Sequence, residues 1–213
     1  MRFIGVCGTS NTRQFDVYGR YNVDGCIRDY HTYKHQCCIL GGDRHLASDY
    51  INKITEVKVA SFPGLSLKNI GYKKCYAGPY QNLTVSGFLS NICSDENFSG
   101  TLAMVMLCND HEHLQTTDSA ETKVKSYLQK LATIFESVAN FEKVKFIIFS
   151  TALHRQEDFW TSTSKKVYCD KKQNFNKCFV RNADTDGFRL CVASEYIPYA
   201  VVDMSAYIPV EQA

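Results

Sequence analysis

The stretch Cys37-Cys38-Ile39-Leu40-Gly41-Gly42-Asp43-Arg44-His45-Leu46 decides the fold class that we expect for this chain. A short apolar run ends in Gly-Gly-Asp, and polar residues then open a segment whose apolar residues have helical spacing. This order predicts a buried strand over 37–40, a tight turn and a helix over 45–54. Open α/β proteins place functional groups at such strand-to-helix turns, because ligands bind outside the carboxyl ends of parallel strands.

Apolar strands and helices continue to alternate along the chain. The longest helical pattern runs from about Ser119 to Phe141, with Asp118 or Ser119 in position to cap it and Glu121 in its first turn. Further strands are predicted at 57–60, 102–107, 144–150, 190–193 and 199–203. Apolar strands that alternate with helices indicate a three-layer, doubly wound α/β fold with a mostly parallel sheet.

Residues 1–35 show no helical period. A short strand is predicted at 3–6, followed by turn-forming residues at 8–11. We therefore expect an irregular N-terminal extension over 1–35 and a single α/β domain over 36–213.

Composition argues against two classes of partner. The 213 residues are 45% hydrophobic and 22% charged, and the net charge is +2, so the chain lacks the strongly basic character of a nucleic-acid-binding domain. No secretory signal and no run of membrane-spanning length is visible. We expect a soluble protein of the cytoplasm or nucleus that binds neither nucleic acid nor membrane.

Three turns follow the predicted strands in an order that resembles the SGNH (GDSL-type) hydrolases, a family of esterases and lipases. Gly42-Asp43-Arg44 stands where that family has Gly-Asp-Ser after its first strand. Gly64 follows the second strand, where a family glycine donates its N–H to the oxyanion. Asn109-Asp110 follows the third strand, where the family has Gly-x-Asn-Asp and the Asn is a second oxyanion donor. The resemblance covers about residues 36–150 and implies an SGNH-like sheet.

Two departures from the family pattern remove its chemistry. Arg44 occupies the serine position, and a guanidinium cannot act as the nucleophile. The family's Asp-x-x-His near the C-terminus is also missing, since the last histidine is His154. We therefore expect no acyl-transfer activity. The residues of the vestigial pocket would be Asp43, Arg44, Gly64, Asn109 and Asp110.

The chain has ten cysteines but no C-x-x-C spacing, which argues against a zinc ribbon or a thioredoxin-like site. Cys38 and Cys108 lie in apolar runs and are expected to be buried and unpaired. Four cysteines in polar surroundings are expected at the surface, where disulfides can form after the protein leaves a reducing compartment. These candidates are Cys26, Cys75, Cys169 and Cys178.

The function predicted first is a non-catalytic, self-assembling structural protein whose partner is itself. Thirteen Tyr and thirteen Phe supply aromatic area of the kind enriched at interfaces. In size and composition, the chain is similar to viral occlusion-body (polyhedrin-like) proteins, which implies intracellular crystals locked by disulfides.

Two alternatives remain open. One is an esterase-like hydrolase with a non-standard nucleophile such as Ser48, Ser66 or Cys108, and the other is a module that binds an anionic ligand around Arg44 and Asn109. No cofactor and no metal is expected, because His111-Glu112-His113 lacks the spacing of a helical zinc site and is better explained as a solvated loop.

Overall fold

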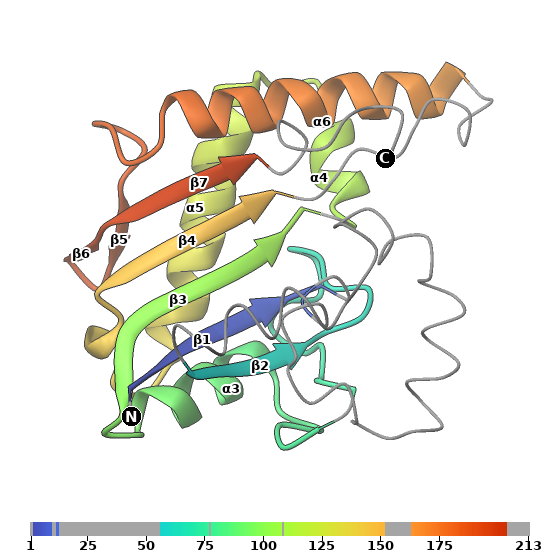
Figure 1. Ribbon diagram of the computed structural model, residues 1–213. Helices are drawn as coiled ribbons and strands as arrows, with labels where there is room; N and C mark the ends of the chain where they lie inside the picture. The colour runs from blue at the N-terminus through green and yellow to red at the C-terminus, as the bar shows by residue number, and fades with distance from the viewer. Residues whose placement is uncertain are drawn as a thin grey trace.

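A computed structural model describes residues 2–9, 12, 56–76, 78–107, 109–151 and 163–203. Their centre is a five-stranded sheet in the order β2-β1-β3-β4-β7, in which every neighbouring pair is parallel (Figure 1). The strands are β1 (Phe3–Gly8), β2 (Glu56–Ser61), β3 (Phe98–Met106), β4 (Phe146–Thr151) and β7 (Tyr199–Asp203). A separate antiparallel pair is formed by β5 (Leu190–Val192) and β6 (Glu195–Ile197).

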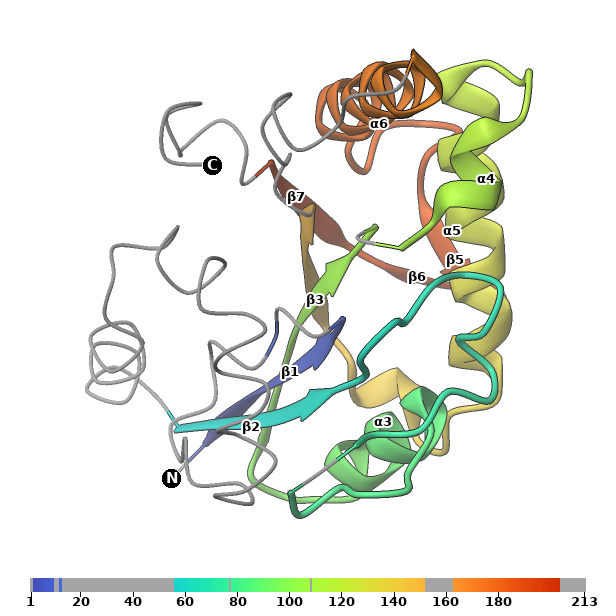
Figure 2. The ribbon, with the colours of Figure 1, turned by 90° about the vertical axis from the view of Figure 1, so that its right-hand side faces the viewer.

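The helices lie between the strands in the chain. They are α3 (Val85–Cys93), α4 (His111–Gln115), α5 (Ala120–Glu136), the short 3₁₀ helix η2 (Phe141–Lys143) and α6 (Thr163–Arg181). Figure 2 shows α3 and α5 on one side of the sheet. The expected α/β class with a mostly parallel sheet is therefore confirmed, whereas the helix expected at 45–54 lies outside the described residues.

One aromatic cluster attaches α6 to the sheet. Neighbouring rings in it have centroids 5.3 to 5.9 Å apart, close to the range preferred by aromatic pairs. Its members come from α5, β4, α6 and β7: Tyr127, Phe149, Phe175, Phe179 and Tyr199. All five side chains are buried, so the cluster fixes which face of α6 turns toward the sheet.

The N-terminal boundary expected from sequence is wrong for residues 3–8. These residues form β1, which pairs with β2 on one side and with β3 on the other. Phe3 and Cys7 lie in the main core, while Val6 packs with Val57 and Val59 in a second cluster. The alternation of these side chains between two apolar clusters is what a strand buried on both faces requires.

Candidate functional site

The carboxyl ends of β1, β2 and β3 meet at one edge of the sheet. The Phe62 N–H donates to the Gly8 carbonyl at 2.9 Å, and the Thr9 N–H donates to the Val105 carbonyl at 2.9 Å. Gly8 has a φ of +144°, and a Cβ at this residue would lie 2.0 Å from the Val105 carbonyl oxygen. The turn that follows β1 is therefore held directly against the ends of both neighbouring strands.

Polar side chains gather around the first residue of that turn. The Thr9 carbonyl accepts hydrogen bonds from the Thr12 hydroxyl at 2.6 Å and from the Ser61 hydroxyl at 3.3 Å. Thr9 and Thr12 are both buried. Ser10 comes next in the sequence after Thr9 and lies outside the described residues.

The loops after β2 and β3 contact each other beside this turn. The Asn109 side-chain amide donates to the Leu65 carbonyl at 3.1 Å, and the Leu67 N–H donates to the Asp110 carboxylate at 2.6 Å. Gly64 has a φ of +73°, the left-handed conformation that favours glycine. Its carbonyl accepts from the Asn69 side-chain amide at 2.9 Å. Three residues that the sequence analysis assigned to one pocket, Gly64, Asn109 and Asp110, thus lie at the same edge.

Asp110 is the most buried charged group at this edge, with 2% of its surface exposed. Burial raises the pKa of its carboxyl from 3.8 to about 6, while the Leu67 N–H and the Lys172 ammonium oppose that shift. Oδ1 accepts the Leu67 hydrogen bond, whereas Oδ2 is buried and has no hydrogen-bond partner among the described residues.

Helix α6 supplies Lys172, whose charge lowers the pKa of Asp110 more than that of Lys130 does. Lys172 is buried, and its positive charge also lowers the pKa of His111, for which burial is the larger cause. Asn176 follows Lys172 by one helical turn and is fully buried. Neither polar atom of its side chain has a hydrogen-bond partner within the described ranges.

The ends of β4 and β7 add another polar pair to the carboxyl edge. The Thr151 hydroxyl donates to an Asp203 carboxylate oxygen at 2.9 Å, and these two residues are in register across the two strands. Sequence reasoning missed this pair and missed Thr9, Thr12 and Lys172. The available signal was that the apolar runs 3–8, 146–149 and 199–202 are each followed by a small polar residue or an acid.

Several sequence predictions for the site fall on residues that are not described. Asp43, Arg44, Ser48 and Cys108 all lie outside the described residues, so the expected strand at 37–40 and its turn stay predictions. Ser66 is described and buried, and its N–H donates to the Asn69 side-chain oxygen at 2.9 Å.

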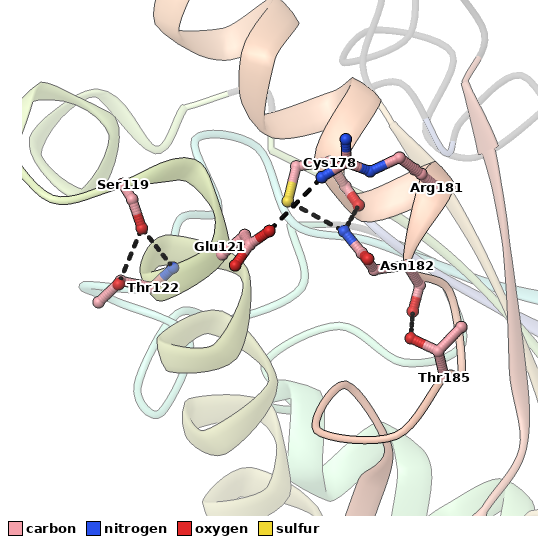
Figure 3. A network of polar contacts seen from close by, with 7 residues as sticks. All are labelled: Ser119, Glu121, Thr122, Cys178, Arg181, Asn182 and Thr185. Carbon is pink, nitrogen blue, oxygen red and sulfur yellow. Dashed lines mark hydrogen bonds and ion pairs between the residues drawn. The ribbon is translucent and has the colours of Figure 1, made fainter.

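Surface exposure was the wrong expectation for two of the four disulfide candidates, since Cys75 and Cys178 are buried. Cys178 faces a polar network between α5 and α6, where its sulfur accepts from the Asn182 side-chain amide at 3.3 Å (Figure 3). Burial raises the pKa of this thiol. Cys178 has polar neighbours in the sequence because it lies in helix α6, which has one polar face and one apolar face. Cys26 and the side chain of Cys169 are not described.

No protein-family model and no curated protein matches the chain. Within the described ranges, no helix is both long and apolar enough to cross a membrane. In the same ranges, no three His, Cys, Asp or Glu side chains gather in a way that could hold a metal ion.

Proposed function

We propose that this chain is a hydrolase of ester or related acyl bonds, with its site at the carboxyl ends of β1, β2 and β3. The observation that carries the proposal is the place of β1 between β2 and β3 in a parallel sheet. The chain leaves β1 as Gly8-Thr9-Ser10. Open α/β sheets bind ligands where neighbouring connections diverge, and here that point lies between β1 and β3.

The nucleophile in this proposal is Ser10. The expectation of no catalysis rested on Arg44 as the residue after the first strand of the sheet. If β1 is that strand, the position after its Gly-x is a serine, whose hydroxyl can attack an acyl carbon once a base takes its proton. This assignment brings the chain closer to the SGNH resemblance than the turn at 42–44 does.

Two donors for the oxyanion are proposed at the carboxyl edge of the sheet. Asn109 donates one amide hydrogen to the Leu65 carbonyl, and an amide nitrogen carries a second hydrogen that can reach the oxyanion. The Gly64 N–H, from the loop that Asn109 holds, is the other donor. Fixed donors of this kind stabilise the charge that develops in acyl transfer, and loss of one costs about 100- to 1,000-fold in rate.

The base that we propose is His154. It follows Thr151, the last residue of β4, by three positions, and the carboxyl end of β4 belongs to the same edge. Its imidazole would take the proton from the serine hydroxyl and return it to the leaving group.

The test is hydrolysis of short p-nitrophenyl esters by the full chain. We expect Ser10→Ala to lower kcat/KM by at least about 100-fold, because the attacking hydroxyl is lost. The matched control is Ser137→Ala, since Ser137 caps the far end of α5, away from this edge. A chain without turnover, or a Ser10→Ala variant as active as the parent, would refute the proposal.

Self-assembly remains the competing proposal, and exposed tyrosines favour it. Tyr72 and Tyr196 are 67% and 47% exposed, and tyrosine is enriched in protein interfaces. Size-exclusion chromatography with and without reductant separates the two ideas. A chain that elutes as a monomer in both conditions would exclude a cross-linked lattice.

A further inference from the structure

The loops after β2 and β3 are joined by a row of polar contacts. Each contact pairs a residue from 65–68 with a residue from 109–112, in the same order along both loops. From the turn outward, they are Asn109 with the Leu65 carbonyl, the Leu67 N–H with Asp110, and Lys68 with Glu112 at 2.8 Å. Because the three contacts follow the same order along both loops, they fix the register of one loop against the other.

The contacts in this row differ in strength. The ion pair between Lys68 and Glu112 is exposed, with 69% and 72% of the side chains accessible, and exposed pairs contribute little. Asp110 is buried and accepts a backbone N–H at 2.6 Å, which is a charge-assisted bond in a site that water does not screen. Asp110 is therefore the contact on which the register of the two loops depends most.

Titratable groups from three helices face this carboxyl. Lys172 on α6 and Lys130 on α5 both favour the carboxylate, and His111 on α4 is its neighbour in the chain. Despite two cations, burial dominates and raises the pKa from 3.8 to about 6. A carboxyl whose pKa rises on folding stabilises the protein fully below about pH 3.8, and that contribution is lost as the pH rises to about 6. At neutral pH, the fold thus keeps a carboxylate that lowers its stability, as functional groups often do.

We propose that Asp110 is a pH-responsive positioning residue, which as a carboxylate holds segment 65–67 against the loop after β3 and so sets the positions of Gly64 and Asn109. The effect on catalysis rests on the proposed function, but the effect on the loop does not.

Protonation weakens this attachment in two ways. A proton from solvent adds to Oδ2, the oxygen that Leu67 does not use. The bond from the Leu67 N–H then loses its charge assistance, which is worth about half of its strength. The attraction between Asp110 and Lys172 is lost at the same time. Leu65, whose carbonyl holds the Asn109 amide, is only two residues from Leu67.

The direct test follows the Leu67 amide by ¹H–¹⁵N NMR between pH 4.5 and 8 in the full chain. We expect its shift to titrate with a midpoint near 6, and to be flat in Asp110→Asn. The matched control is Asp95→Asn, at the opposite edge of the sheet, which should leave the Leu67 titration unchanged. A flat Leu67 shift in the parent chain, or the same titration in Asp110→Asn, would overturn the proposal.

A second variant covers the case in which Asp110→Asn does not fold. Lys172→Met removes a cation that favours the carboxylate, so the Leu67 midpoint must move to higher pH. An unchanged midpoint would contradict the proposed coupling between Asp110 and α6.

Ester hydrolysis gives the functional readout. In the parent chain, kcat/KM should fall below pH 6, and Asp110→Asn should remove that part of the pH profile. If the chain has no esterase activity but Leu67 titrates as expected, the proposed function fails and the loop attachment stands. If hydrolysis is present and its acid limb is the same in Asp110→Asn, the positioning role is refuted alone.

Discussion

At Gly8, the last residue of β1, the backbone of β3 occupies the place where a side chain would begin. A Cβ there would lie 2.0, 2.7 and 2.8 Å from backbone atoms of Val105, and backbone cannot move aside as a flexible side chain can. Its φ of +144° is also a conformation that other residues avoid. Any side chain at this position must therefore separate the two strand ends.

Gly8→Ala is expected to lower the free energy of unfolding by at least about 2 kcal/mol, through overpacking and backbone strain together. The measurement is urea unfolding monitored by circular dichroism. Gly71→Ala is the control, because a Cβ at Gly71 would meet only the Ile134 side chain at 3.9 Å. Equal midpoints for the two variants would show that the strand ends tolerate separation.

The sequence predicted that three residues lie at the site, but it did not predict their hydrogen-bond partners. The SGNH resemblance implied Gly64, Asn109 and Asp110, each of which follows a predicted strand, and parallel strands bring such positions to one edge. The contact of Asp110 with Leu67, 43 positions away, depends on the lengths of two loops and has no local signal. Burial of Lys172 is equally invisible in a polar stretch such as 170–174.

At the scale of elements, local chemistry predicted α5 well and two other helices poorly. Ser119 caps α5 as expected, since its hydroxyl accepts from the Thr122 N–H at 3.2 Å. The helix ends at Glu136, five residues early, and Asn140 then takes a left-handed conformation. The sequence analysis predicted no helix at α3, although Val85, Phe88, Leu89 and Ile92 have helical spacing after Thr84. Helix α6 was not predicted because most of its residues are polar. Its apolar side is recognised only from the aromatic cluster.

Two reciprocal contacts attach α4 to α5. The buried Lys123 ammonium donates to the Leu114 carbonyl at 3.1 Å, and the His113 ring nitrogen Nε2 lies 3.0 Å from the Lys123 carbonyl. Because α4 has five residues, its last carbonyls depend on such external donors. The position of α4 matters for the site, since Asp110 immediately precedes this helix.

Lys123→Met is expected to destabilise the fold by about 1–3 kcal/mol, because the Leu114 carbonyl loses its donor in a buried place. That corresponds to a fall in Tm of several degrees for a chain of this size. Lys130→Met, on the exposed face of the same helix, should change Tm by much less. The measurement is the Tm by calorimetry. An equal Tm for both variants would mean that the Lys123 amine contributes nothing to the stability of the fold.

At the scale of the whole molecule, the sheet order explains why the predicted boundary at residue 35 was wrong for residues 3–8. Residues 13–35 carry no helical period, and the strand at 3–6 was therefore grouped with them. Pairing with β2 connects residues more than 50 positions apart, for example Val6 with Val59, and no pattern in either segment records its partner. The α/β class could be predicted because buried parallel strands are apolar throughout, whereas their order in the sheet could not.

The place of β1 makes a firm prediction about a shortened chain. If residues 1–35 were a mere extension, a chain of residues 36–213 would fold as the full chain does. With β1 absent, β2 and β3 lose the strand that pairs with both, and the core loses Phe3 and Cys7. We expect residues 36–213 to unfold without a cooperative transition, and a peptide of residues 1–35 added in trans to restore part of the native circular dichroism signal. A cooperative transition at the Tm of the full chain would mean that β1 is dispensable, and it would also count against the proposed nucleophile after this strand.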